Sequence, residues 1–315
     1  MLRLAVTLGD PRGIGAEVVD KAVCRFVDEI PDVEVVRLGA DGFDSGRSPF
    51  RSVGAWDGTE ASAGTVAAAA IRAAAEMALR GEAAAVVTAP IHKPALQAAG
   101  FREAGHTEML RELSGASTVG MLMTAETTRW GTPLRVLLAT THVPLRDVPR
   151  LLTAELLVEK GLLLREALRH DWGIEEPRIA FCALNPHASD RGLFGDEEER
   201  LYAPALGELT GMGVNAAGPI PADTVFVRAL KGEFDAVLAP YHDVGMAAFK
   251  TVAFGTGVNV TLGLPFVRTS PDHGTAFDLA GRGVADESST LEALRLATRL
   301  AARRRRRKDE GERAT

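Results

Sequence analysis

Apolar, β-branched runs alternate with helical patterns along almost the whole chain. Residues 2–7 and 33–39 have the composition of strands, and the segment 16–30 between them has that of a helix. The alternation continues with an Ala-rich helix over 61–80 and a strand over 83–90. Strands that alternate with helices are typical of parallel sheets joined by crossover helices. The sequence therefore predicts an α/β fold.

Chain length and composition set the size and class of the protein. With 315 residues, the chain is long enough for two α/β lobes or one large domain, and no clean linker divides it. The net charge of -6 and the scarcity of aromatic residues argue against general nucleic-acid binding. The basic run 303–308 extends a helical pattern and is followed at once by acidic residues, so we interpret it as a solvated tail.

The chain shows no pattern of a membrane span or a signal peptide. Its first residues, MLRLAVTLGD, form too short an apolar run and lack a basic flank. Nowhere do apolar residues continue uninterrupted for about 18 positions. Cys24 and Cys182 lie far apart, each in an apolar element, which favours two free thiols in a reducing compartment over a disulfide. We therefore expect a cytoplasmic protein that does not contact a membrane.

Three more predicted strands each end at a histidine. The apolar runs RVLLATTH, RIAFCALNPH and FDAVLAPYH finish at His142, His187 and His242. Three neutral imidazoles around one point make a good site for a divalent metal and leave positions open for substrate oxygens. Asp243, directly after His242, could orient that ligand or accept a proton. A metal site and three separate structural histidines both remain open on spacing alone.

A second group of residues indicates an anionic substrate. The segment GHTE supplies an imidazole at His106 and a hydroxyl at Thr107, and Lys250, Asn259 and Arg268 lie in Gly-rich, apolar surroundings. Arg holds an oxyanion with two hydrogen bonds, and Gly lets backbone amides approach it. These residues fit a ligand that carries a phosphate and a carboxylate.

Several well-known motifs are absent from the sequence. The chain contains no GxGxxG, no GxxxxGK[ST], no GxSxG and no CxxC. Hydrolysis by a Ser-His-Asp triad and phosphoryl transfer by a P-loop therefore lose their best sequence support. A nicotinamide cofactor would have to bind elsewhere than in the usual Rossmann turn.

Taken together, the motifs resemble those of one known family, the 4-hydroxythreonine-4-phosphate dehydrogenases of pyridoxal phosphate biosynthesis. The resemblance runs in order from residue 4 to about residue 297. The segments that carry it are TLGDPRGIGAE, VTAPIHK, GHTEML, TTHVPL, LNPHAS, GPIPADTVF, YHDVGMAAFK and GVNVTLGLPFVRTSPDHGTAFDLAGRG.

The resemblance implies a two-lobed α/β/α fold like that of isocitrate and isopropylmalate dehydrogenases. The active site of such proteins lies in the cleft between the lobes, at the interface of a homodimer. We expect residues 1–125, joined by 280–315, to form the first lobe, and residues 126–279 to form the second, which carries the metal histidines.

The resemblance also assigns roles to the residues singled out above. Residues corresponding to His142, His187 and His242 bind a divalent metal such as Zn, Mg, Co or Mn, with ligands drawn from both subunits. The residues that correspond to substrate contacts are His106, Thr107, Lys250, Asn259 and Arg268.

The implied reaction is an oxidation followed by a decarboxylation. NAD or NADP takes a hydride from C3 of 4-phosphohydroxy-L-threonine, and the resulting 3-oxo acid loses carbon dioxide to give 3-amino-2-oxopropyl phosphate. Asp223 or Asp243 could accept the hydroxyl proton. The sequence does not choose between NAD and NADP.

One loop departs from the family pattern and keeps other activities open. The family has a Gly-rich segment where this chain has HASDRGLFG, with Asp190, Arg191 and Leu193 at unusual positions. A sister enzyme that oxidises D-threonate or D-erythronate 4-phosphate would use the same residues. A hydrolase of a phosphorylated small molecule, with three histidines holding its metal, is a further alternative.

Overall fold

The computed structural model describes residues 1–103 and 105–313, which form two compact units. Unit 1 comprises residues 1–119 and 255–315, and unit 2 comprises residues 120–254. The sequence indicates a return to the first lobe at about residue 280, whereas the chain returns at Gly255. The reason is strand pairing: residues 267–269 pair with residues 85–87 of unit 1.

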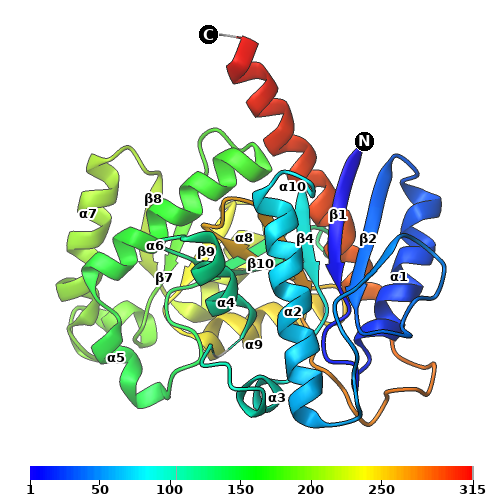
Figure 1. The fold of residues 1–315 in the computed structure, drawn as a ribbon. Coiled ribbons are helices and arrows are strands. Elements are labelled where there is room, and N and C mark those ends of the chain that lie inside the picture. Colours follow the sequence, from blue (N-terminus) through cyan, green and yellow to red (C-terminus); the bar gives the residue numbers. More distant parts are fainter. Residues whose placement is uncertain (104, 314–315) are drawn as a thin grey trace. The chain divides into compact units, whose positions relative to one another are not determined.

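In the described part of unit 1, six strands form a sheet in the order β3-β2-β1-β4-β11-β10. Figure 1 labels β1, β2, β4 and β10 of this sheet. Neighbouring strands are parallel except β10, which runs antiparallel to β11. The strands are β1 (Leu2–Thr7), β2 (Val33–Gly39), β3 (Phe50–Ser52), β4 (Ala85–Thr88), β10 (Val258–Leu262) and β11 (Val267–Pro271).

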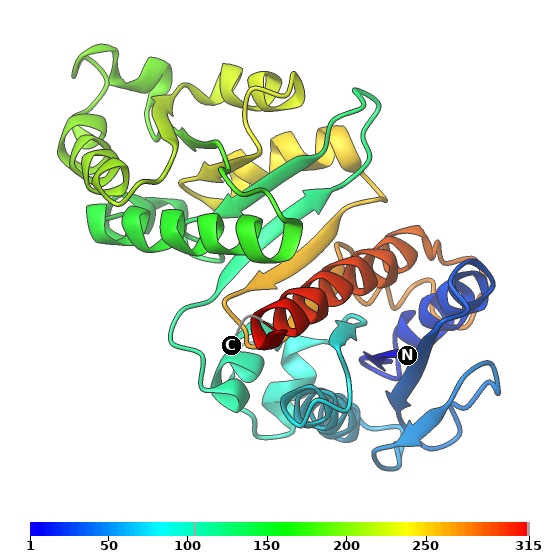
Figure 2. The same cartoon turned by 90° about the horizontal axis from the view of Figure 1, so that it is seen from above.

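Helices cover both faces of this sheet. On one face, α2, α3 and α4 share an apolar cluster with Ala5, Leu38 and Val86 of the strands. On the other, α1 and α10 pack against each other, and Figure 2 shows them on the opposite side of β1 from α2. The helices are α1 (Gly15–Glu29), α2 (Glu60–Leu79), α3 (Lys93–Ala98), α4 (His106–Ser114) and α10 (Ser288–Arg313).

The sheet of unit 2 has five strands in the order β5-β6-β9-β7-β8. The strand β5 is antiparallel to β6, and β6, β9, β7 and β8 are mutually parallel. The strands are β5 (Gly120–Ala125), β6 (Leu134–Leu138), β7 (Ile179–Cys182), β8 (Ala216–Ile220) and β9 (Ala236–Ala239).

The side chains of β7 show how this second sheet is covered. Ala180 and Cys182 join the cluster formed with α8 and α9, whereas Phe181 points the other way and packs beneath Gly161 of α6. The longer helices are α6 (Ala154–Ala167), continued by η2 (Leu168–Trp172), α7 (Ala203–Gly211), α8 (Ala222–Leu230) and α9 (His242–Ala253). The short ones are η1 (Leu145–Asp147), α5 (Val148–Leu151), η3 (Pro186–Asp190) and η4 (Glu198–Tyr202).

The predicted α/β class is confirmed, and so are the predicted free thiols. Cys24 and Cys182 are unbonded. Burial, together with the charge of Glu198, raises the pKa of Cys182 to about 12, so this thiol stays protonated. Within the described part of the chain, no helix is both long and apolar enough to cross a bilayer.

A glycine in α2 is required by the packing of α3. A Cβ at Gly64 would overlap the backbone carbonyl of Ala95 and approach the nitrogen of Leu96 to 2.9 Å. We expect Gly64→Ala to lower the free energy of unfolding by about 1–3 kcal/mol in urea denaturation, because backbone cannot move aside as a side chain does. Gly207→Ala in α7, where a Cβ meets open space, is the matched control and should stabilise by about 0.5–1 kcal/mol. Equal effects of the two substitutions would contradict this packing.

Candidate functional site

The parallel strands of unit 2 deliver ionisable side chains to one edge of the sheet. His142 follows β6, His242 follows β9, His187 follows β7, and Asp223 follows β8. Since β6, β9, β7 and β8 are adjacent and parallel, their carboxyl ends lie at the same edge. Ligands of open α/β sheets bind at this edge. The residues that follow the strands in the sequence, His142, His242, His187 and Asp223, therefore form a row of candidate site residues along this edge.

His142 and His242 face each other within the row. Beyond the strand ends the two segments remain paired, with the amide of Thr140 donating to the carbonyl of Pro240 at 3.2 Å. The imidazole centroids of His142 and His242 lie 5.4 Å apart, with 46° between the ring planes. Two imidazoles that bind one tetrahedral ion have centroids about 5 Å apart, given Zn–N distances near 2 Å. The pair therefore fits a shared divalent cation.

Asp243 orients one of these rings. Its Oδ1 lies 2.7 Å from Nδ1 of His242, which leaves Nε2 of that ring for a ligand. A carboxylate on the second nitrogen is the usual partner of a metal-binding histidine. Asp243 is 86% exposed, so its side chain is held by this contact rather than by packing.

His187 stands at the start of an unusual stretch of backbone. Residues 187–191 all have positive φ, from 42° to 68°, although none is glycine. Left-handed backbone costs L-residues about 1–2 kcal/mol each, so surrounding contacts must hold this segment. The His187 imidazole is exposed and lies beside the ring of Phe194, with centroids 6.4 Å apart.

His187 is not part of a preassembled three-ligand cluster. Among residues 1–103 and 105–313, no group of three or more His, Cys, Asp or Glu side chains is placed to hold one metal ion. The structure of one chain therefore brings His142 and His242 together but not His187. The resemblance to the dehydrogenase family implies ligands from two subunits, and a single chain would then present an incomplete set.

Lys250 and Asp223 occupy different helices of unit 2. Lys250 lies on α9 two turns after His242, which places both on one face of that helix, about 12 Å apart along its axis. Its ammonium group lies 5.9 Å from the ring centroid of Phe254. Asp223 is exposed in the first turn of α8, where a carboxylate is favoured by the helix dipole.

Unit 1 contains a buried cationic group at Arg268 of β11. The residue is 2% exposed. Its guanidinium donates to the hydroxyls of Thr261 at 2.9 Å and Thr88 at 2.6 Å, two residues that the sequence reasoning did not single out. Burial lowers the pKa of Arg268 to about 10, and the charge of Glu108 opposes part of this decrease. The guanidinium is therefore still positive at neutral pH. A buried charge with neutral partners attracts an anion.

Three predicted substrate residues of unit 1 carry buried polar atoms that have no partner. Among the described residues, Nε2 of His106, Oδ1 of Asn259 and Nε of Arg268 are shielded from solvent and make no hydrogen bond. Asn259 and Thr261 point to the same face of β10, and Thr261 contacts Arg268. Unpaired buried polar groups are costly, so these three atoms indicate a place for a polar ligand. Thr107, beside His106, is half-buried.

The first loop of the chain forms a separate network in unit 1. Arg12 donates to the buried Asp10 at 2.8 Å and to Glu60 at 3.1 Å, and its guanidinium lies 5.1 Å from the ring centroid of Phe277. The hydrogen bond to Asp10 raises the pKa of Arg12 above its ordinary value, and Glu60 adds to the effect. His92 joins through its Nδ1, 3.1 Å from Arg12.

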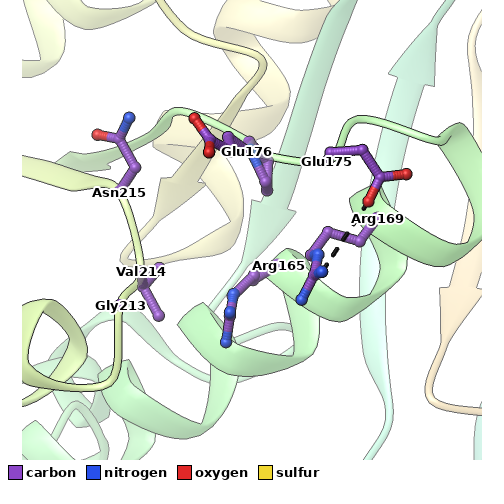
Figure 3. A pocket seen from close by; sticks show the side chains of 8 residues that line it. Arg165, Arg169, Glu175, Glu176, Gly213, Val214 and Asn215 are labelled. Atoms are coloured by element: carbon purple, nitrogen blue, oxygen red, sulfur yellow. Dashed lines mark ion pairs between the residues drawn. The ribbon is translucent and has the colours of Figure 1, made fainter.

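An open pocket lies away from the candidate site. It has a volume of about 410 Å³ and is lined by Arg165, Arg169, residues 175–177 and residues 213–215 (Figure 3). The last two segments precede β7 and β8, so the cavity lies at the amino ends of these strands. The histidines follow the carboxyl ends. Arg169 is engaged with Glu175 at 3.9 Å, as the dashed line in Figure 3 marks.

Comparisons with known proteins identify relatives of the whole chain. The family model "Pyridoxal phosphate biosynthetic protein PdxA" matches residues 24–297. The chain is 42% identical to 4-hydroxythreonine-4-phosphate dehydrogenase of Beijerinckia indica, over 94% of each protein. The solved 4-hydroxythreonine-4-phosphate dehydrogenase of Klebsiella pneumoniae is similar in fold, with a TM-score of 0.82 and 35% identity over 96% of this chain and 100% of that one.

A more distant likeness concerns the fold alone. Isocitrate dehydrogenase of Methylococcus capsulatus has a TM-score of 0.57 and 15% identity, covering 94% of this chain and 85% of that one. The isocitrate-dehydrogenase-like α/β fold implied by the motifs is therefore confirmed.

The half-buried imidazole of His106, whose Nε2 is shielded from solvent, predicts a pH-dependent stability. Burial lowers the pKa of His106 well below its ordinary value of 6.5, and the charge of Arg268 lowers it further. As the pH falls through 6.5 the unfolded chain takes up a proton that the folded chain does not, so the free energy of unfolding decreases, by at most about 1.4 kcal/mol per pH unit. We expect His106→Asn to show a shallower decrease than the wild type below pH 6.5, measured by urea denaturation without ligands. Parallel curves would show that this imidazole titrates normally.

Proposed function

The chain belongs to the PdxA family and is an oxidoreductase of the 4-hydroxythreonine-4-phosphate dehydrogenase type, and we propose that His142, His187 and His242 hold the divalent metal of this reaction. The observation that carries the proposal is the facing pair of imidazoles at the carboxyl edge of β6 and β9, 5.4 Å apart. Neutral imidazoles suit Zn or Co, and open oxygen positions admit Mg or Mn.

The proposed substrate is 4-phosphohydroxy-L-threonine, oxidised at C3 with NAD or NADP. The C3 hydrogen leaves as a hydride to the nicotinamide, and the hydroxyl proton passes to a protein carboxylate. The 3-oxo acid then loses carbon dioxide, and protonation of the remaining enolate at carbon gives 3-amino-2-oxopropyl phosphate. A bound divalent cation supplies Lewis-acid stabilisation of the negative charge that develops on the reacting oxygen.

The carboxylates of unit 2 have different roles in this proposal. Asp243 is committed to Nδ1 of His242 and so orients the ring. Asp223 has its carboxylate exposed at the same edge of the sheet and is therefore our proposed acceptor of the hydroxyl proton. The sequence left both Asp223 and Asp243 as candidates, and the 2.7 Å contact of Asp243 with His242 supports the choice of Asp223.

The substrate's phosphate and carboxylate match the polar groups described above. Nε of Arg268 would donate to a substrate oxygen, and so would Nε2 of His106 in the tautomer that carries a proton there. Oδ1 of Asn259 would accept from a substrate hydroxyl or ammonium group, and the hydroxyl of Thr107 would donate beside them. Lys250 would add a positive charge on the histidine side, through α9. In these assignments, the bound substrate makes hydrogen bonds to buried polar atoms that have no partner within the protein.

We also propose that the enzyme acts as a cytoplasmic homodimer with ligands contributed by both subunits. Exposed apolar side chains flank two of the histidines: Val143 and Leu145 follow His142, and Leu193 and Phe194 follow His187. Leu193 is 71% exposed and Leu145 is 65% exposed. Apolar side chains gathered beside a site are typical of a protein contact. The two free cysteines agree with a reducing compartment.

Spectrophotometric turnover tests the function. The purified protein is incubated with NAD or NADP, a divalent metal, and either 4-phosphohydroxy-L-threonine, D-threonate 4-phosphate or D-erythronate 4-phosphate, with a chelator as control. We expect nicotinamide reduction with the amino acid, and its loss on chelation. Faster turnover of a hydroxy acid would reassign the enzyme to the sister activity. Phosphate release without nicotinamide reduction would indicate a hydrolase instead.

Removal of one proposed ligand tests the metal assignment. We expect His187→Ala to lower kcat by roughly 100-fold or more while the melting temperature stays within a few degrees, because the exposed imidazole contributes little packing. His170→Ala is the matched control, since His170 is a partly exposed histidine of the same unit whose Nε2 lies 2.7 Å from Glu166. Near-normal turnover of the His187 variant would refute the three-histidine site.

A further inference from the structure

Glu198 is the buried carboxylate of an acidic run whose other carboxylates are exposed or half-buried. It lies in the segment DEEER, residues 196–200, at the start of η4. Glu199 is exposed, whereas Glu198 is 5% exposed. A buried carboxylate requires compensating donors, so its hydrogen-bond partners show what it holds.

The partners of Glu198 all belong to the segment around His187. Oε1 accepts hydrogen bonds from the backbone amides of Leu184 at 3.0 Å and Asn185 at 2.7 Å. Oε2 accepts from the side-chain amide of Asn185 at 2.9 Å and from the hydroxyl of Ser189. One carboxylate therefore holds the chain three and two residues before His187 and two residues after it.

These hydrogen bonds keep the carboxylate charged. Burial raises the pKa of Glu198, but the bonds from Ser189 and Asn185 outweigh this and hold the pKa below its ordinary value. A charged acceptor makes stronger hydrogen bonds than a neutral one.

The held segment needs such support because its backbone is strained. His187 (φ 52°), Ser189 (φ 68°) and the residues between and after them lie in the left-handed region. Among the described residues, no side chain hydrogen-bonds to the His187 ring, in contrast to His242, which Asp243 orients directly. The backbone therefore sets the direction in which the side chain of His187 leaves the main chain.

We infer that Glu198 is a positioning residue for His187: its carboxylate fixes the backbone on both sides of that histidine and so presents the imidazole to the divalent metal. The inference rests on the proposed role of His187 as a metal ligand. Glu198 would then not bind the metal itself. It would act on His187 through hydrogen bonds to the neighbouring segment and not through a contact with the imidazole ring.

Metal affinity without substrate or nicotinamide is the direct test. Isothermal titration of the metal-free protein with Co²⁺ should give a dissociation constant about 10- to 100-fold higher for Glu198→Gln than for the wild type. Excess Co²⁺ should then restore kcat, because the variant retains every ligand. Ser189→Ala, which removes one donor to the same carboxylate, should weaken binding in the same direction and keeps the test valid if the Gln variant fails to fold.

Two controls separate positioning from general stability. Glu199→Gln removes the neighbouring exposed carboxylate and should bind Co²⁺ as the wild type does. Tyr202→Phe breaks a buried hydrogen bond to the carbonyl of Cys182, 2.9 Å, and should lower the melting temperature without changing Co²⁺ affinity.

The outcomes distinguish this inference from the proposed function. If His187→Ala weakens Co²⁺ binding but Glu198→Gln and Ser189→Ala do not, only the positioning role is lost. Should affinity fall in proportion to melting temperature in all variants, Tyr202→Phe included, Glu198 would be merely structural. Unchanged Co²⁺ affinity in His187→Ala itself would instead overturn the metal assignment on which both depend.

Discussion

The parallel pairing of β6, β9 and β7 is the constraint on which the candidate metal site depends. Residues 136–138 of β6 pair with 237–239 of β9, and residues 179–181 of β7 pair with 236–238 of β9. Because side chains that follow parallel strands emerge at one edge, three histidines from distant parts of the sequence reach the same side of one sheet. Helices α8 and α9 and the helix α6 bury the two faces of this sheet, so the edge is a rigid support.

Two features of the proposed site lower the free energy of unfolding of the protein without ligand. Arg268 is buried with two hydroxyls for partners, and the backbone after His187 is left-handed without glycine. Neither feature stabilises the isolated chain, and both occur where ligand contacts are proposed. Strained backbone and unsatisfied buried groups often occur at functional sites, because a bound ligand makes the hydrogen bonds and contacts that the protein alone does not make.

Local patterns predicted much of this structure, and long-range pairing decided the rest. The segments that end at His142, His187 and His242 were visible as strands because each contains an uninterrupted run of apolar residues. The return of the chain at Gly255 was not visible, because the pairing of β11 with β4 joins residues far apart in sequence. Glu198 could not be separated from its neighbours, since nothing in the letters DEEER marks which carboxylate is buried. The left-handed segment was hidden as well, because its sequence lacks the glycines that signal positive φ.

X-ray absorption at the metal edge of the Zn²⁺- or Co²⁺-loaded protein tests the central claim most directly. We expect one ion per chain, a coordination shell of only nitrogen and oxygen at about 2.0–2.2 Å, and outer-shell scattering that fits about three imidazoles. Scattering from fewer than two imidazoles, or a sulfur ligand near 2.3 Å, would contradict a site built by the histidines at the carboxyl edge of this sheet.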